Sequence, residues 1–115
     1  MDVTIYHNPR CSKSRATLEL LEARGIEPTI VEYLQTPPSR ETLRDILSAL
    51  GLSPMQLVRK KEACFEEAGL ANPDASDDAV IEAMLAHPIL IERPIVLANG
   101  KAAIGRPPEA VLEIL

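Results

Sequence analysis

Hydrophobic and polar residues alternate at the start of the chain and then take on a helical spacing. Residues 3–7 alternate between two sides, which predicts a short strand that ends at Pro9, because proline lacks the N–H that a strand ladder needs. Leucines then recur on one face over about 12–24, and Gly25 stands where a glycine commonly ends a helix. A second strand is expected at 29–33. Together these segments predict a β-α-β unit.

The middle of the chain has helical spacing only. Four apolar residues between 43 and 50 lie at i, i+3, i+4 and i+7, the spacing of an amphipathic helix. Ser39 is placed to cap this helix and Gly51 to end it. A short helix is expected over 53–58. More helix is expected after the polar stretch 59–62 and ends near 69, and another helix is expected over 76–87. This part of the chain is therefore expected to be all-helical.

The last third returns to strands. An apolar run at 95–98 precedes Asn-Gly at 99–100, the strongest two-residue hairpin signal, and 101–104 is the return strand. A proline pair at 107–108 opens a final helix. The order β-α-β, helices and β-β-α predicts an α/β chain with a thioredoxin-like fold, interrupted by a helical insertion over about 39–90.

Length and composition narrow the class of protein. The chain has 115 residues, enough for one domain over 1–115, and one Phe, two Tyr and no Trp predict an aliphatic core. The net charge of -5 argues against a general nucleic-acid binder, which is normally basic. The sequence shows no signal peptide and no apolar run near the roughly 20 residues of a membrane span, so we expect a cytoplasmic protein. The sequence has no heptad pattern and no apolar face beyond those expected in the core, so we expect a monomer.

Cys11 falls between a predicted strand end and a predicted helix start. The open N–H groups of a helix start favour negative charge, and thiols in such places have pKa values of roughly 3.5–7.5. The same geometry makes an anion pocket, so one loop could both bind an oxyanion and attack it. Positive charge and hydrogen-bond donors are supplied nearby by His7, Arg10, Ser12, Lys13, Ser14 and Arg15.

The two cysteines are far apart in a chain expected in a reducing compartment, so each is interpreted separately. A lone cysteine is most often an inert core residue, but polar neighbours favour a functional role for Cys11. Cys64 has apolar neighbours on both sides, which favours core packing. Ser14 takes the fourth position of a Cys-x-x-Cys pattern, so a second thiol has to come from a small molecule, another protein or Cys64. His7 either merely ends the strand or tunes Cys11.

Three arginines stand beside apolar segments. Arg59 ends one such segment, Arg93 precedes the apolar strand, and Arg106 follows the return strand. Arginine suits a bidentate grip on a tetrahedral oxyanion. The spacing alone leaves two alternatives open, namely convergence near Cys11 or three solvated surface side chains. Base rates alone favour a trans bond between Arg93 and Pro94.

Several segments of the chain carry a family resemblance, in order and at the expected spacing. They are Tyr6-His7-Asn8-Pro9-Arg10-Cys11, Ser14-Arg15, Thr17-Leu18, Arg59-Lys60, His87-Pro88-Ile89-Leu90, Arg93-Pro94-Ile95-Val96 and Arg106-Pro107-Pro108-Glu109. With these segments the chain resembles the glutaredoxin-coupled arsenate reductase (ArsC) family, in particular its short bacterial branch, which lacks the C-terminal extension of longer members. The resemblance implies an oxidoreductase with a thioredoxin-like fold and a helical insertion.

The resemblance also implies roles for individual residues. Cys11 is implied to be the nucleophile, and the oxyanion and its covalent thiol adduct are implied to be held by Arg59, Arg93 and Arg106. The residues implied to keep Cys11 ionised or to shape its loop are His7, Asn8, Ser14 and Arg15. Pro94 is implied to be cis.

The implied reaction is the reduction of arsenate, or a similar oxyanion, to arsenite for arsenic detoxification. The Cys11 thiolate attacks arsenate, glutathione acts as co-substrate, and glutaredoxin removes the mixed disulfide that remains on Cys11. Such exchange needs one protein thiol, which agrees with Ser14 in place of a second cysteine. No bound cofactor, metal, nucleic acid or membrane is implied.

Two other functions fit parts of the pattern. A general glutathione-dependent thiol oxidoreductase would use Cys11 on disulfides, but it needs no clamp of three arginines for an oxyanion. A transcription regulator on this fold would bind RNA polymerase and sense redox state through Cys-x-x-Cys, and Ser14 argues against such a switch.

Overall fold

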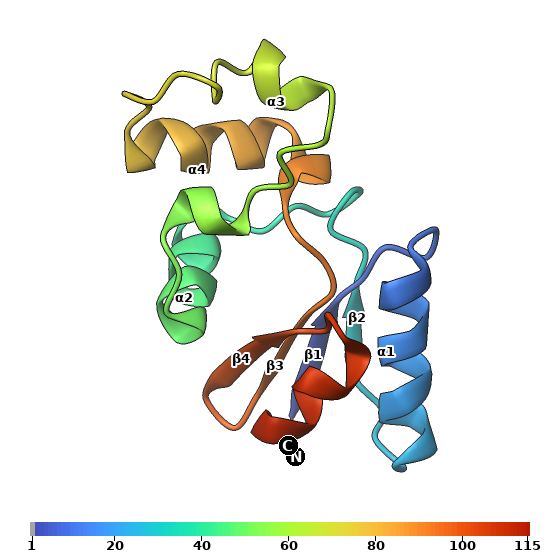
Figure 1. Cartoon of the computed structure of the whole chain (residues 1–115). Helices are drawn as coiled ribbons and strands as arrows, with labels where there is room; N and C mark the ends of the chain where they lie inside the picture. The colour runs from blue at the N-terminus through green and yellow to red at the C-terminus, as the bar shows by residue number, and fades with distance from the viewer. Residues whose placement is uncertain (1) are drawn as a thin grey trace. The chain divides into compact units, whose positions relative to one another are not determined.

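The computed structural model describes residues 2–115, and its four strands form one sheet (Figure 1). The strands stand in the order β2-β1-β3-β4, with β1 parallel to β2 and antiparallel to β3, and β4 antiparallel to β3. Their bounds are Val3–Tyr6 for β1, Thr29–Val31 for β2, Ile95–Ala98 for β3 and Lys101–Ile104 for β4. The predicted β-α-β unit and the C-terminal hairpin therefore share one sheet.

Helix α1 (Ser12–Ala23) and the 3₁₀ helix η3 (Pro108–Ile114) pack on one face of this sheet. Side chains two apart on a strand share a face, and the register pairs Ile5 of β1 with Val96 of β3 in the middle of the core. The buried residues of this core are Val3, Ile5, Leu21, Val96, Ala98, Val111 and Ile114. All are aliphatic, as the composition predicts.

Two segments differ from the sequence-based expectation. Strand β2 ends at Val31, two residues early, because the chain turns there: the N–H of Gln35 donates to the carbonyl of Glu32 at 3.0 Å. The last helix is 3₁₀ rather than α, and the N–H of Ala110 donates to the carbonyl of Pro107 at 3.0 Å, three residues back.

Pro37–Glu92 forms a compact unit of its own, and the remaining described residues form the other. The helices of Pro37–Glu92 are α2 (Arg40–Leu50), η1 (Pro54–Leu57), α3 (Cys64–Glu67), α4 (Asp77–Ala86) and η2 (Pro88–Leu90). Ser39 Oγ accepts a hydrogen bond from the N–H of Thr42, which caps α2 as predicted, and Gly51 ends α2 in the left-handed region at φ 69°. This unit contains the helical insertion that the sequence predicts at about 39–90; a single domain over 1–115 stays a prediction.

The prediction that Cys64 packs in a core is wrong. Helix α3 has no buried residue, and Cys64 at its start is a half-buried, free cysteine. Because α3 has only four residues, it makes about one turn and has no stripe of apolar side chains to bury. The apolar neighbours of Cys64 in the sequence therefore do not indicate a core position.

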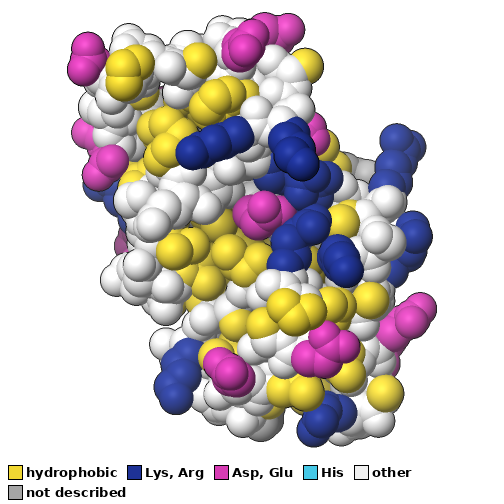
Figure 2. Space-filling view, in the orientation of Figure 1, with side chains coloured by type: hydrophobic (Ala, Val, Ile, Leu, Met, Phe, Trp, Pro, Cys, Tyr) yellow, Lys and Arg dark blue, Asp and Glu magenta, His cyan; other side chains and the backbone are white. Residues whose placement is uncertain are grey.

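The sheet, with its parallel β1–β2 pair, its antiparallel β3–β4 hairpin and its helices, has the thioredoxin-like arrangement expected from the sequence. None of the helices formed by residues 2–115 has the length and apolarity needed to span a bilayer. Within the same residues, no group of three or more His, Cys, Asp and Glu side chains is placed to hold a metal ion. In Figure 2, Asp and Glu side chains stand singly or in small groups, some of them next to Lys or Arg side chains.

Candidate functional site

Cys11 stands at the junction of β1 and α1, where the sequence predicts it. It is the N-cap residue of α1, with an extended backbone at φ -94° and ψ 123°. Its N–H donates to the carbonyl of Asn8 at 3.0 Å, and its carbonyl accepts the N–H of Arg15 at 3.0 Å. The side chain is partly exposed, so the sulfur is accessible to a ligand.

The surroundings of Cys11 lower the pKa of its thiol below the usual value. Burial alone raises this pKa, but hydrogen bonds from the backbone N–H groups of Ser14 and Lys13 outweigh it. A hydrogen bond from the Arg93 side chain and the positive charge of Arg106 lower the pKa further. The N–H groups come from the first turn of α1, where they have no partner within the helix. These contacts shift the thiol toward its ionised form, and a thiolate nucleophile at Cys11 stays a prediction.

Arg93 and Arg106 lie together because the β3–β4 ladder brings their segments side by side. The register pairs Ile95 with Ile104, so the residues before β3 and after β4 are neighbours. Arg106 Nε donates to the Arg93 carbonyl at 2.8 Å, and Arg106 Nη2 lies 3.5 Å from Cys11 Sγ. Two of the three arginines singled out in the sequence therefore contact the sulfur of Cys11.

The backbone around these arginines is closely packed. The Arg93–Pro94 peptide bond is cis, as the resemblance implies, and the Arg106–Pro107 bond is also cis, which the sequence did not predict. The N–H of Gly105 donates to the Pro94 carbonyl at 2.9 Å. A Cβ added to Gly105 would lie 2.7 Å from Pro94 Cγ and would also collide with the Thr17 hydroxyl. Gly105 and Thr17 thus shape the site, although the sequence indicates Gly105 only as a break after a strand.

His7 and Ser14 form a buried hydrogen-bonded pair beside the loop of Cys11. His7 Nδ1 lies 2.6 Å from Ser14 Oγ, which also accepts the N–H of Asn8 at 3.0 Å. Burial is the main cause that lowers the pKa of His7; the charge of Glu32 raises it and that of Arg15 lowers it. With a neutral His7 ring, the Ser14 hydroxyl can donate its proton to Nδ1 and accept the N–H of Asn8, so all three groups have a hydrogen-bond partner. The pair therefore joins β1 to the first turn of α1.

Asn8 and Arg15 act on the loop rather than on the sulfur. Asn8 Oδ1 accepts the N–H of Arg10 at 3.0 Å, which holds the turn between β1 and α1. Arg15 Nη1 donates to the Pro9 carbonyl at 3.0 Å on the exposed side of the same turn. Both side chains thus brace the segment that presents Cys11.

Arg59 belongs to the Pro37–Glu92 unit, so its convergence on Cys11 stays a prediction. Its N–H donates to the Leu90 carbonyl at 2.7 Å, next to a β-bridge between Val58 and Ile91. Arg59 Nη1 lies 2.9 Å from Glu92 Oε1. Sequence reasoning missed this contact, because the two residues are far apart in the chain.

A second carboxylate stands near the same guanidinium. Glu62 Oε1 is 3.8 Å from Arg59 Nε, and that nitrogen is buried without a hydrogen-bond partner. The cluster consists of Arg59, Glu62 and Glu92, and the exposed fractions of their side chains are 24%, 25% and 27%. One cation between two carboxylates leaves this cluster with a net negative charge.

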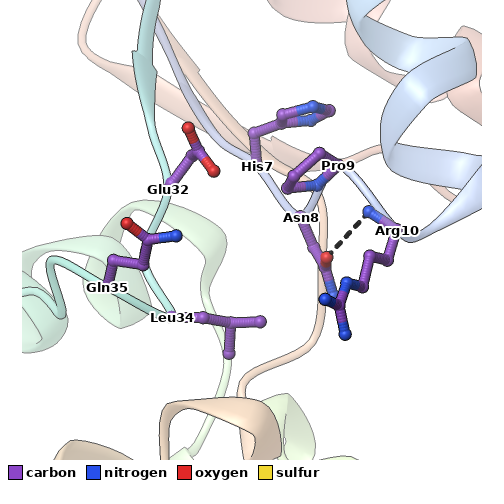
Figure 3. A pocket seen from close by; sticks show the side chains of 7 residues that line it. All are labelled: His7, Asn8, Pro9, Arg10, Glu32, Leu34 and Gln35. Carbon is purple, nitrogen blue, oxygen red and sulfur yellow. Dashed lines mark hydrogen bonds between the residues drawn. The ribbon is translucent and has the colours of Figure 1, made fainter.

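A pocket of about 160 Å³ lies beside the loop that leads from β1 to Cys11 (Figure 3). Its lining residues are His7, Asn8, Pro9, Arg10, Glu32, Leu34 and Gln35. They come from the loop after β1 and the turn after β2, which are adjacent because the two strands pair in parallel. Sequence reasoning singled out the first of these segments and missed the second.

We expect the pH dependence of Cys11 alkylation to change when Arg106 is replaced. Arg106→Gln removes a positive charge that lowers the pKa of Cys11, so the pKa rises and less thiolate is present at neutral pH. The midpoint of the iodoacetamide reaction rate should move to higher pH. Arg24→Gln, which removes an equal charge at the far end of α1, is the matched control. An equal midpoint in both variants would contradict the assigned role of Arg106.

Comparison with known proteins finds similarity along the whole chain. The ArsC family model matches residues 6–114. The uncharacterized protein YfgD of Escherichia coli K12 is 58% identical over 98% of this chain and 96% of its own length. An arsenate reductase of Neisseria meningitidis serogroup A is 52% identical over 99% of this chain and 98% of its own length. The solved structure of an arsenate reductase from Vibrio cholerae covers 100% of this chain and 98% of its own, with 54% identity and a TM-score of 0.97.

Proposed function

Because the chain belongs to the ArsC family, we propose that it reduces arsenate to arsenite in the cytoplasm, with glutathione as co-substrate and glutaredoxin as partner. The contact between Cys11 and Arg106 is the observation that carries the proposal. A thiol with a lowered pKa lies 3.5 Å from a guanidinium nitrogen that can also bind an oxyanion. Nucleophile and oxyanion donor are thus in one place.

In the first step the Cys11 sulfur attacks arsenic. An S–As bond forms and one As–O bond breaks: a hydroxyl oxygen of arsenate takes up from solvent the proton that the thiol released on ionising, and it leaves as water. Arg93 and Arg106 offset the negative charge of the oxyanion as the thiolate approaches. Arg59 is the third member of this proposed clamp. His7, Asn8, Ser14 and Arg15 keep the loop and the ionised sulfur in place.

In the second step the glutathione thiolate attacks the sulfur of Cys11 in the adduct. The S–As bond breaks, and its electron pair stays on arsenic, which becomes trivalent and leaves as arsenite. Each of the two sulfurs has given one electron, and they remain joined as a mixed disulfide. Thiol–disulfide exchange through glutaredoxin then restores the Cys11 thiol. Ser14, which cannot form a disulfide with Cys11, fits this single-thiol cycle.

The proposal is tested by arsenate-dependent NADPH oxidation in a mixture of the protein, glutathione, glutaredoxin and glutathione reductase. We expect oxidation that requires arsenate, glutathione and the protein, and that slows when glutaredoxin is left out. Absence of arsenate-dependent oxidation, with the protein folded and Cys11 reduced, would refute the proposal. Turnover of glutathione-mixed disulfides in its place would indicate a general thiol oxidoreductase.

Glu92 is expected to weaken oxyanion binding, because its carboxylate occupies Arg59 Nη1. Glu92→Gln removes this competing charge, so the KM for arsenate should fall about threefold, an effect of the size of a partly exposed ion pair. Inorganic phosphate, which has the same shape and charge, should inhibit more strongly by a similar factor. Steady-state kinetics with both anions measure these effects.

The matched control is Glu66→Gln, which removes an equal charge from the exposed side of α3 in the same unit. This variant should leave the KM for arsenate and the inhibition constant of phosphate unchanged. A higher KM for arsenate in Glu92→Gln would mean that Glu92 orients Arg59 for the oxyanion instead of competing with it.

A further inference from the structure

We propose that the pocket beside the Cys11 loop binds the γ-glutamyl end of glutathione. The inference rests on the proposed function, since it assigns a place to the co-substrate of that reaction. The γ-glutamyl end carries an α-carboxylate and an α-ammonium group on one carbon, and it is the part of glutathione farthest from the thiol along the N-terminal side. A site for it therefore needs a cation, an anion and amide groups close together.

The size of the pocket suits one end of a small peptide. Pockets that enclose a whole drug-sized ligand have volumes of roughly 300–1,000 Å³. The pocket here has about 160 Å³, so it can hold a single amino-acid-sized group and leave the rest of the tripeptide outside. Pro9 and Leu34 provide the apolar surface against which the methylene groups of a glutamyl chain can pack.

The charges around the pocket match a zwitterion. Arg10 stands on one side and Glu32 on the other (Figure 3). Neither charged group makes a hydrogen bond or ion pair within residues 2–115, although the charge of Glu32 acts on His7. The Arg10 guanidinium can take the α-carboxylate of the ligand, and the Glu32 carboxylate can take its α-ammonium group. The amides of Asn8 and Gln35 add donors and acceptors between them. A simple anion such as arsenate would use Arg10 alone and be repelled by Glu32.

The position of the pocket lets the thiol of the bound molecule reach the sulfur of Cys11. Asn8 lines the pocket, and its carbonyl accepts the N–H of Cys11 at 3.0 Å, so the two residues are the ends of one tight turn. The Cα atoms at the ends of such a turn lie within about 7 Å. A peptide spans about 3.5 Å per residue, and the glutathione thiol is on its second residue. With its glutamyl group in the pocket, glutathione is therefore long enough for its cysteine thiol to reach the sulfur of Cys11.

The experiment compares two thiol co-substrates, glutathione and cysteinylglycine, which lacks the γ-glutamyl group. In Arg10→Gln and in Glu32→Gln we expect the KM for glutathione to rise about fivefold, the effect of one partly exposed charged contact. The KM for cysteinylglycine and the KM for arsenate should stay as in the unaltered protein. Glu32→Gln takes away a charge that raises the pKa of His7, so the ring of His7 stays neutral in this variant. A change that is equal for both thiols, or no change for glutathione, would overturn the proposal.

A binding measurement separates this proposal from the proposed function. S-methylglutathione cannot react, so its binding to the unaltered protein can be followed by amide chemical shifts whether or not arsenate is reduced. We expect the largest shifts at residues 7–10 and 32–35, and their loss in Arg10→Gln. Shifts elsewhere only, or none at millimolar concentration, would show that the pocket does not bind the tripeptide. Shifts at the pocket without arsenate turnover would support the glutathione site while refuting the reductase.

Discussion

Cys11→Ser should lower the kcat/KM for arsenate by at least about a thousandfold, because the hydroxyl that replaces the thiol is a far weaker nucleophile at neutral pH. The contacts that lower the pKa of Cys11 act by stabilising a thiolate: the N–H groups of Ser14 and Lys13 and the side chains at Arg93 and Arg106. A serine in this place stays protonated, so the same contacts cannot activate it. The coupled assay with glutathione and glutaredoxin measures the loss.

The matched control for this variant is Cys64→Ser. Cys64 is half-buried on α3 in the Pro37–Glu92 unit and has no step in the proposed single-thiol cycle, so its replacement should leave arsenate reduction near the level of the unaltered protein. Loss of activity in Cys64→Ser would instead indicate that Cys64 supplies the second thiol. Activity retained in Cys11→Ser would mean that Cys11 is not the nucleophile.

Local signals in the sequence predicted most of the elements. Ser39 caps α2 and Ser76 caps α4, each by accepting an N–H three residues on, and Gly51 ends α2 at a positive φ. The turn at 99–100 has φ of 54° and 73°, which is the conformation that Asn-Gly favours. These features depend on neighbours within four residues, so they can be seen in a single sequence.

Arrangements that depend on distant neighbours could be predicted only in part. The loop of Cys11 was predicted because a strand end, a helix start and the basic residues are contiguous. The proximity of Arg93 and Arg106 follows from the register of β3 and β4, which the hairpin signal only suggests. The contact of Arg59 with Glu92 and the second side of the pocket come from pairing between segments far apart in the chain.

Two of the differences from the sequence-based expectation have a common physical origin. Cys64 was expected in a core from its apolar neighbours, but burial depends on whether a helix is long enough to have a packed face. The strand β2 was expected to reach 33, but the turn after Val31 ends it. In both cases composition over a few residues was outweighed by the geometry of the element that contains them.

Gly105→Ala should destabilise the protein and disturb the site at the same time. An added Cβ would lie 2.7 Å from Pro94 Cγ and would collide with the Thr17 hydroxyl, and the hydrogen bond from the Gly105 N–H to the Pro94 carbonyl leaves the backbone little room to move away. Overpacking of this kind costs about 1–3 kcal/mol in the free energy of unfolding. Chemical denaturation of both proteins measures the cost.

The cause of that destabilisation can be tested with Thr17→Ala, which removes the Thr17 hydroxyl and methyl groups and leaves Pro94 Cγ as the nearest atom to the new Cβ. If the collision is responsible, Gly105→Ala should cost less in the Thr17→Ala background than in the unaltered protein, because the pair is coupled. Equal costs in the two backgrounds would contradict the collision with Thr17.

Since Arg106 follows Gly105 directly, a shifted backbone should also move the Arg106 guanidinium away from Cys11. The pH midpoint of Cys11 alkylation should then rise in Gly105→Ala. An unchanged midpoint alongside lower stability would mean that the close packing of Gly105 supports the fold without positioning Arg106.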